Sequence, residues 1–171
     1  MRLRPGPRKL VLSVHLVVSV GWIGSVAAYL ALDVATVISH DPEILRAAYL
    51  GMDLIVQSVI VPLAVATLTT GIVISLGTRW GLFRHYWVVI SLLLTVVAAV
   101  VLLSETRTIR ALAGIAADPS TTSAELSALN STLVHSVGGL LLLIAVLVLN
   151  VYKPRGLTRY GWRKQATSDR S

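Results

Sequence analysis

The segment from Tyr86 to Ser104, YWVVISLLLTVVAAVVLLS, contains no charged residue in 19 positions. An α-helix rises about 1.5 Å per residue and the hydrocarbon core of a bilayer is about 30 Å thick, so about 20 apolar residues cross it. The segment therefore predicts a transmembrane helix.

Three further segments are apolar and longer than this one: Leu10 to Ser39, Ala47 to Leu76, and Leu129 to Tyr152. None of the four contains lysine or arginine. Of the 171 residues 55% are hydrophobic and 13% are charged, and the mean hydropathy of +0.78 is too high for a soluble domain. The sequence predicts an all-α fold, an up-down-up-down bundle of four transmembrane helices. We expect a single domain over residues 1–171, in which residues 153–171 form a basic tail.

The basic residues predict the orientation, because cytoplasmic loops of membrane proteins are enriched in lysine and arginine. Arg46, Arg107 and Arg110 lie on one side of the predicted membrane. The other 12 lie on the opposite side: Arg2, Arg4, Arg8, Lys9, Arg79, Arg84, Lys153, Arg155, Arg159, Arg163, Lys164 and Arg170. We therefore expect both termini in the cytoplasm of a multi-pass plasma-membrane protein.

Two other interpretations of the charge pattern fit the sequence less well. Ser25-Val26-Ala27 has the form of a signal-peptide cleavage site, but the apolar run continues to Val37, beyond the about 7 to 15 residues of a signal core. The net charge of +7 is compatible with nucleic-acid binding, yet the basic residues flank apolar segments. We therefore expect a retained first helix and the lipid bilayer, not nucleic acid, as partner.

Helix-start signals precede the second and fourth spans. Asp41 can cap the second helix, and Pro42 suits its first position. Thr122 and Glu125 have the spacing of a capping box ahead of the fourth span. The third helix is expected to continue from Glu105 to Ala117, beyond the lipid.

The first span carries a polar stripe. Six of its residues follow one another at steps of three or four and so share one face of a helix: His15, Ser19, Trp22, Ser25, Tyr29 and Asp33. A polar face does not suit lipid, so we expect it to face the bundle interior. Two interpretations stay open: these side chains bind a ligand or transported species, or they only hydrogen-bond to neighbouring helices.

The second span adds Asp53 and Gln57, one turn apart on one face. Pro62 follows them and is expected to kink the helix, because it leaves the carbonyl of Ser58 without its usual donor. That carbonyl is a candidate ligand for a cation or water.

Each span also has one ionisable group near its outer end: Asp33, Asp53, Glu105 and His135. Three carboxylates and an imidazole suit a proton relay or the entry of a divalent cation, although helix ends also collect such residues because water is near. His15 is expected near the level of Asn150, on the cytoplasmic side, and about 18 Å from the level of His135. The two histidines should therefore not ligate one haem iron together.

Small residues and boundary aromatics are interpreted structurally. We expect Gly21, Gly24, Gly138 and Gly139 to lie where helices pack closely. Six aromatic residues at the cytoplasmic boundary are expected to anchor the protein at the lipid headgroups: Trp80, Tyr86, Trp87, Tyr152, Tyr160 and Trp162.

The first helix contains a histidine at His15, six intervening residues, and then Trp22-Ile23-Gly24. This pattern resembles the first helix of three bacterial families: small uncharacterised integral membrane proteins, the copper-resistance D family and the four-helix protoporphyrinogen oxidase family. The segment NVYKPRGLTRYG, from Asn150 to Gly161, resembles the uncharacterised family, which would cover nearly the whole chain and implies no known activity.

The other two resemblances cover only the surroundings of His15 and Trp22, and each implies a cofactor. The oxidase family implies a haem with His15 as a ligand, although its proline and arginine after the tryptophan are missing between Ser25 and Asp33. The copper family implies imidazole and methionine ligands, and the chain has two methionines, Met1 and Met52. The identity of any bound metal stays open.

The sequence has no cysteine, no paired nucleophile and base, and no phosphate-binding loop, so we do not expect an enzyme. We expect a transport component, or a proton or cation conduit, that uses the stripe with Asp53, Gln57 and His135. Because four spans rarely enclose a pathway alone, a homo-oligomer or a partner membrane subunit is expected. The alternatives are a haem- or quinone-linked redox protein with His15 as ligand, and a structural or scaffolding subunit.

Overall fold

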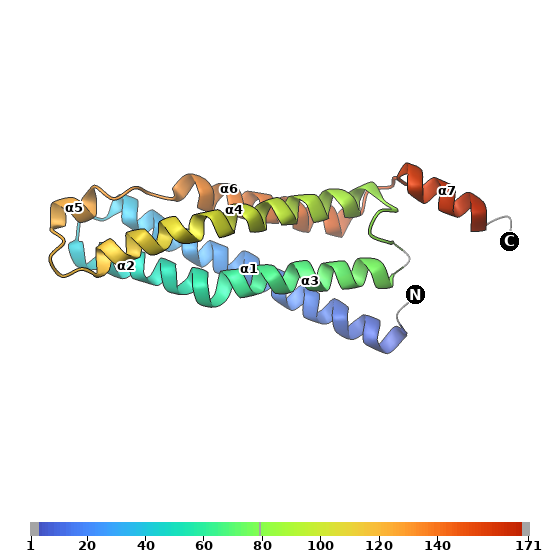
Figure 1. Cartoon of the computed structure of the whole chain (residues 1–171), viewed down its shortest axis with the longest axis horizontal. Helices are drawn as coiled ribbons and strands as arrows, with labels where there is room; N and C mark the ends of the chain where they lie inside the picture. The colour runs from blue at the N-terminus through green and yellow to red at the C-terminus, as the bar shows by residue number, and fades with distance from the viewer. Residues whose placement is uncertain (1–3, 79, 169–171) are drawn as a thin grey trace.

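Four helical rods lie side by side in the computed structural model, which describes residues 4–78 and 80–168 (Figure 1). Each rod is long and apolar enough to cross a membrane. The prediction of an all-α four-helix bundle is confirmed. The elements are α1 (Pro5–Ile38), α2 (Pro42–Ile55), the π-helical turn η1 (Val56–Ile60), α3 (Val61–Gly77), α4 (Tyr86–Ala117), α5 (Ser123–Ser127), α6 (Leu133–Tyr152) and α7 (Arg159–Ser168). Arg2, Arg79 and Arg170, which contribute to the predicted orientation, lie outside the described residues.

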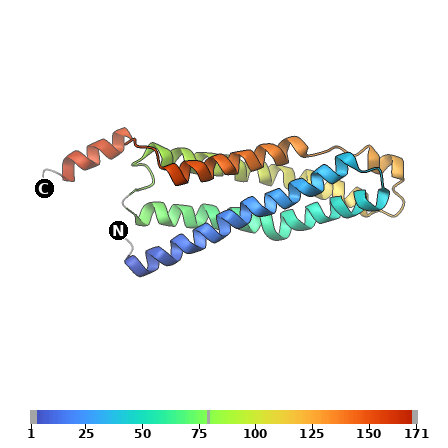
Figure 2. The same cartoon turned by 180° about the vertical axis from the view of Figure 1, so that it is seen from behind.

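The rods form a closed ring in chain order. α1 packs on the rod formed by α2, η1 and α3, that rod packs on α4, α4 packs on α6, and α6 returns to α1. The start of α1 and the short helix α7 lie at one end of the bundle, which we name the terminal end (Figure 2). The opposite end carries the turn between α1 and α2 and the loop 118–132, and we name it the distal end (Figure 1).

The second rod contains a π-helical turn just before Pro62. At its end the backbone N–H of Val61 donates to the carbonyl of Val56, five residues earlier. A proline lacks the N–H that would continue the usual pattern, so the rod changes its hydrogen bonding here. Val56 and Ile60 of this turn are fully buried in the core. Asp41 and Pro42 occupy the predicted positions at the start of the rod, where the Asp41 carboxylate accepts from the amide of Glu43 at 2.9 Å.

Arg46 of α2 holds the distal loop in place. Its guanidinium donates to the backbone carbonyls of Ala116 at 2.6 Å, Asp118 at 2.7 Å and Thr121 at 2.6 Å. A cation at the C-terminal end of a helix is favourable, and α4 ends at Ala117. The predicted extension of the third helix from Glu105 to Ala117 is confirmed.

The capping box of Thr122 and Glu125 is present, but it starts the five-residue helix α5. Residues 128–132 are not helical, and the fourth span begins at Leu133 rather than at Leu129. The predicted start was wrong because the N-cap, Thr132, makes no side-chain cap bond, and the carboxylate that binds its amide belongs to Asp33, far away in the sequence.

At the terminal end, the tail is docked onto the loop between α3 and α4. The amide of Thr158 donates to the carbonyl of Arg84 at 3.0 Å, and its hydroxyl donates to the carbonyl of Phe83 at 2.5 Å. His85 and Leu157 form an isolated antiparallel bridge beside these bonds. The start of α7 is therefore fixed to the end of the bundle.

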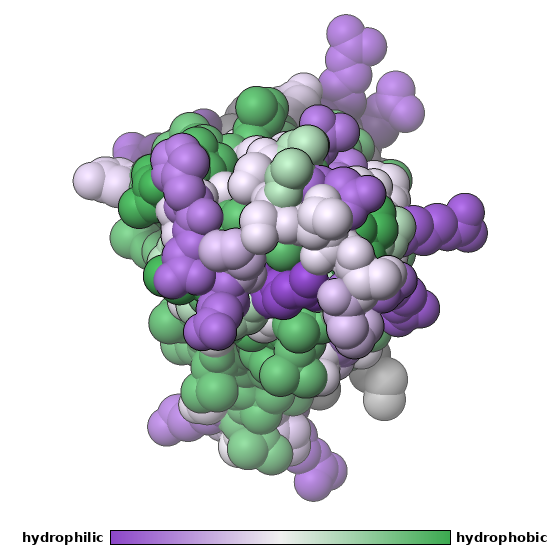
Figure 3. All heavy atoms as spheres, turned by 90° about the vertical axis from the view of Figure 1, so that its left-hand side faces the viewer, coloured by the Kyte–Doolittle hydropathy of each residue, from purple (hydrophilic) through white to green (hydrophobic). Residues whose placement is uncertain are grey.

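The sides of the bundle are apolar and its distal end is polar. Large apolar residues are exposed along all four rods, for example Leu16, Leu54, Leu93 and Leu141. Viewed from the distal end, hydrophilic side chains gather over the end of the bundle, and hydrophobic ones lie on its flank (Figure 3). Lipid covers such flanks in a bilayer, and the protein is therefore a multi-pass membrane protein.

Candidate functional site

Two cavities of about 330 and 310 Å³ lie inside the ring of helices. The distal cavity is enclosed by α1, η1, α4 and α6, and the terminal cavity by α1, α3, α4 and α6. Trp22 of α1 and Leu143 of α6 line both cavities, and both residues are buried. These two side chains therefore form a common apolar wall across the bundle interior.

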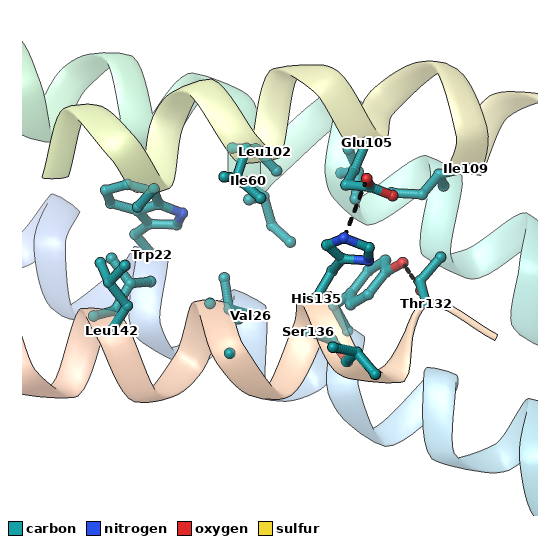
Figure 4. A pocket seen from close by; sticks show the side chains of 18 residues that line it. Trp22, Val26, Ile60, Leu102, Glu105, Ile109, Thr132, His135, Ser136 and Leu142 are labelled. Carbon is teal, nitrogen blue, oxygen red and sulfur yellow. Dashed lines mark hydrogen bonds and ion pairs between the residues drawn. The ribbon is translucent and has the colours of Figure 1, made fainter. Parts of the chain in front are cut away.

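The distal cavity has mostly apolar walls and a polar end (Figure 4). Trp22 and Leu142 lie at one end of it, and Glu105 and His135 lie toward the other (Figure 4). The Nε2 atom of His135 is 3.6 Å from a carboxylate oxygen of Glu105, and the two side chains are 54% and 21% exposed. At 3.6 Å the two groups are too far apart for a hydrogen bond, and both line the cavity, so each can bond a ligand there.

The cavity opens at the side of the bundle, between α4 and α6. Val101 of α4 and Val134 of α6 line it, and they are 40% and 84% exposed on the surface. Because lipid covers this flank, the opening faces the hydrocarbon core or its boundary.

Tyr29, Thr132 and Asp33 form a chain of hydrogen bonds beside the same polar end of the cavity. A carboxylate can only accept, so the Thr132 hydroxyl donates to Asp33 at 2.9 Å. The Tyr29 hydroxyl, 2.6 Å from that of Thr132, must then donate to it. The oxygen of Tyr29 keeps its acceptor capacity at the edge of the cavity, and Asp33 itself is 0% exposed.

Asp33 binds the start of α6 through further bonds. Its carboxylate accepts from the amide of Thr132 at 3.3 Å and from the hydroxyls of Ser131 at 3.4 Å and Ser136 at 2.7 Å. A carboxylate satisfied by this many donors at a helix N-terminus holds two helices together.

The terminal cavity is lined by two other polar residues of the stripe, His15 and Ser19. The Nδ1 atom of His15 lies 2.9 Å from the hydroxyl of Thr70 on α3, and the ring rests against Gly71. Asn150 lines the cavity with His15, as their predicted levels implied, but its amide donates to the hydroxyl of Ser91 at 3.1 Å. Arg8, in the first turn of α1, and Lys153, the C-cap of α6, line the end of this cavity that faces the terminal end of the bundle.

The structure places the predicted stripe inside the bundle. Trp22, Tyr29 and Asp33 are buried, and the other three members are half-buried. Ser19 lines the terminal cavity, whereas the hydroxyl of Ser25 only bonds the carbonyl of Trp22 at 2.9 Å.

The four ionisable groups predicted near the outer surface do not form one cluster. Glu105 pairs with His135, Asp33 binds α6, and Asp53 accepts from its own-helix neighbour Gln57 at 3.2 Å. Within residues 4–78 and 80–168, no three histidine or carboxylate groups lie close enough to hold a metal ion. Asp53 and Gln57 line neither cavity.

No protein-family model, curated protein or solved structure matches the chain.

The haem predicted from the resemblance does not fit the arrangement around His15. His15 and His135 line different cavities, on either side of the wall formed by Trp22. The described lining of the terminal cavity offers no second histidine and no methionine, and Met52 is buried in the core instead. A six-coordinate haem or a histidine–methionine copper site therefore lacks its second protein ligand here.

Two structural interpretations were wrong. A Cβ atom added at Gly24, Gly138 or Gly139 would meet nothing within 4 Å, so these glycines do not lie at close helix contacts. A Cβ atom added at Gly21 would lie 3.4 Å from the side chain of Leu63, so Gly21 does lie at such a contact. Gly138 and Gly139 instead line the distal cavity, where the missing side chains leave space. Trp87 is not a headgroup anchor, since it is buried against the terminal cavity.

Some residues of the site were not predicted. Thr132 and Ser136 bind Asp33, and Thr67, Ser91 and Trp87 line the terminal cavity. Single serines, threonines and tryptophans in apolar helices are common, and none has a partner within a few positions that would single it out. Their positions opposite α1 become visible only in the folded bundle.

Proposed function

We propose that the protein is a transport component of the plasma membrane whose distal cavity takes up an amphipathic molecule with a cationic or hydroxyl head group. The chemistry of that cavity supports the proposal. Its apolar walls suit a hydrocarbon body, and its polar end offers acceptors, namely the Glu105 carboxylate, the His135 ring and the Tyr29 oxygen. A head group that donates hydrogen bonds complements them.

The route into the cavity also fits a molecule dissolved in the membrane. The opening between α4 and α6 lies beside Val101 and Val134, on the lipid-covered flank. A guest can enter from the bilayer while its head group stays at the level of Glu105. Movement from there to the terminal cavity requires Trp22 and Leu143 to separate, because they line both cavities. The proposed transport step is this displacement, in an oligomer or with a partner subunit.

A conduit for inorganic cations through the whole bundle has less support. Of the described residues that line the terminal cavity, none is acidic, and Arg8 and Lys153 lie at its end. A bare cation that passed Trp22 would meet positive charge without a carboxylate to bind it, whereas an amphipathic guest would still gain apolar contacts with residues such as Leu12 and Leu16. Quinol-linked redox chemistry is the second candidate, because the hydroxyls of a quinol would donate to the same acceptors near Glu105 and His135.

Titration with decylguanidinium tests the binding step. This probe is always charged, and its N–H groups match a carboxylate. Trp22 is the tryptophan that lines the distal cavity, so binding should change its fluorescence, and Trp22→Phe should remove that signal. Glu105→Gln should weaken binding about tenfold. The matched control is Asp53→Asn, which changes a carboxylate that lines neither cavity and should leave the affinity unchanged.

Uptake of radiolabelled decylguanidinium into proteoliposomes tests the transport step. Uptake by the native chain, reduced in Glu105→Gln but not in Asp53→Asn, supports the proposal. Binding without uptake would overturn transport and leave a binding protein. Binding of a decyl-substituted hydroquinone in place of the guanidinium would move the redox candidate ahead, and binding of neither probe would refute the proposed site.

A further inference from the structure

We propose that the terminal cavity is a second binding site, which takes an anionic group carrying an apolar chain. This site is separate from the distal cavity of the proposed function, and it differs from it in chemistry. The distal cavity presents acceptors, whereas the terminal cavity presents donors and positive charge. Neither assignment depends on the other.

The charge of the terminal cavity favours an anion. Arg8 of α1 and Lys153 at the end of α6 line it, and the described part of its lining contains no aspartate or glutamate. Both basic residues are exposed where the cavity opens, so they attract an anion to its mouth, and no acidic side chain on the described wall opposes this attraction. The basic groups lie where the cavity meets the terminal end of the bundle.

Three buried side-chain donors on the wall of the cavity lack a partner, namely those of Thr67, Thr78 and Trp87, and two of them belong to buried residues. The Nε1–H of Trp87 and the hydroxyl of Thr67 form no hydrogen bond with any described residue, and both side chains are only 7% exposed. Buried polar groups are nearly always satisfied, so an unpaired donor calls for an acceptor that the chain does not supply. The indole N–H can only donate, so its partner must carry an acceptor atom.

The backbone at Lys153 points to the same place. This residue has φ 45° and ψ 61°, and it is the non-glycine residue with positive φ in the described chain. The left-handed conformation is unfavourable for a side chain with a Cβ, and such positions collect at functional sites. Here it ends α6 and keeps a lysine on the wall of the cavity.

The cavity also has apolar wall residues, which determine the rest of the ligand. Leu12, Leu16, Leu92 and Val146 line the cavity between the basic end and Trp22. A carboxylate or phosphate with a hydrocarbon chain would place its charge beside the unpaired donors of this cavity and its chain against these residues. Free fatty carboxylates and anionic lipids share this chemistry.

Thermal unfolding of the full chain in a non-ionic detergent, with and without sodium decanoate, tests the proposal. Decanoate should raise the unfolding temperature of the native chain, and Thr67→Val should weaken its binding about tenfold. Without decanoate, Thr67→Val should be at least as stable as the native chain, because an unpaired buried hydroxyl has been removed. Thr69→Val is the matched control: Thr69 is exposed on the same helix and bonds the carbonyl of Val65, so decanoate affinity should stay unchanged.

Lys153→Asn tests the charge while keeping a residue that tolerates the left-handed conformation. Decanoate affinity should fall and unfolding without ligand should stay the same or occur at higher temperature. Native affinity in both Thr67→Val and Lys153→Asn would overturn the proposal, as would failure of decanoate to shift unfolding at all. Loss of decanoate binding in Glu105→Gln would overturn the assignment of decanoate to the terminal cavity. If decylguanidinium does not bind while decanoate binds normally, only the proposed function is refuted.

Competition identifies the source of the anion. Phosphatidylglycerol that displaces decanoate, with phosphatidylcholine inactive, assigns the site to an anionic lipid headgroup. Displacement by neither lipid assigns it to a free carboxylate. Inorganic phosphate should compete poorly, because it has no apolar chain; if it competed as well as decanoate, the apolar part of the proposal would be wrong.

Discussion

The carboxylate of Asp33 on α1 accepts hydrogen bonds from both the backbone amide and the hydroxyl of Thr132, so one helix caps another. Thr132 is the N-cap of α6 and makes no side-chain cap of its own. The unpaired amides at a helix start carry partial positive charge and need acceptors. The buried carboxylate of Asp33 supplies a negatively charged acceptor there. Asp33 therefore fixes both the start of α6 and its position beside α1.

Asp33→Asn should lower the free energy of unfolding by about 2–4 kcal/mol, because the amide turns a donor toward groups that already donate. Urea unfolding in a non-ionic detergent would measure the change. Asp53→Asn is the control: Asp53 is half-buried and bonds only Gln57 among the described side chains, so its effect should stay within about 0.5 kcal/mol. Equal effects of the two substitutions would contradict the capping role.

The helices were predictable from the sequence because the bilayer imposes their length and composition. Tyr86 to Ser104 could be identified from its apolar side chains alone, and α4 contains all of it. The start of α6 was not predictable, because Asp33 supplies its cap from 99 positions away. The π-helical turn before Pro62 was also missed, since proline predicts a disturbance without specifying how the backbone absorbs it.

The candidate site was predictable mainly on α1, and from the other helices Glu105, His135 and Asn150 were also predicted and line the cavities. The periodic spacing of His15, Trp22 and Tyr29 indicated an inward face, and all three line cavities. The groups that complete the cavities come from other helices, where Thr67 and Gly139 stand alone in apolar sequence. A pattern in one helix reports its own buried face, but the distances between helices depend on how the rods pack.

The distal loop should be stable at neutral pH and loosen in acid. Hydrogen bonds from the side chain and then the backbone of Ser120 lower the pKa of Asp118, and bonds from the backbone and then the side chain of Thr122 lower the pKa of Glu125. Both carboxyls are thus more acidic in the folded loop than in an unfolded chain, where their pKa values are about 4. The two carboxylates therefore contribute fully to the stability of the folded loop above a pH of about 4. This contribution is lost as the pH falls through their pKa values in the folded loop.

Amide resonances of Ser120 and Thr122 would follow this transition, because their N–H groups donate to the two carboxylates at 2.8 and 2.7 Å. We expect constant shifts between pH 7 and about 5 and a shared change below about 4. In the double variant Asp118→Asn and Glu125→Gln the change should vanish. A transition of the same size in that variant would assign it to other groups.

The tail helix α7 should be released by one added methyl group. A Cβ atom at Gly161 would collide with the backbone carbonyl of Arg84, which has little freedom to move. Gly161→Ala should therefore break the contact between α7 and the loop, and trypsin should cut at Arg159 and Arg163 faster. Gly156→Ala is the control, since its Cβ would make an ordinary 3.6 Å contact with Tyr86. Unchanged cleavage of Gly161→Ala would show that the loop adapts.

Gly139 offers a way to fill the distal cavity without disturbing the fold. A Cβ atom there meets nothing within 4 Å, and the residue lines a cavity of about 330 Å³. Gly139→Leu should place its side chain in this space and replace a poor helix former by a good one, so the unfolding temperature should not fall. Decylguanidinium binding should weaken at least about tenfold, whereas decanoate binding in the terminal cavity should persist.

Gly24→Leu separates filling of the cavity from the mere addition of an apolar side chain. Gly24 also has open space around it, but it is exposed on α1 and lines neither cavity. Its substitution should leave both affinities unchanged while giving a similar gain in helix propensity. If Gly139→Leu and Gly24→Leu bound decylguanidinium equally well, the guest would not occupy the space between α4 and α6, and the acceptors at Glu105 and His135 would have to be reached from outside the bundle.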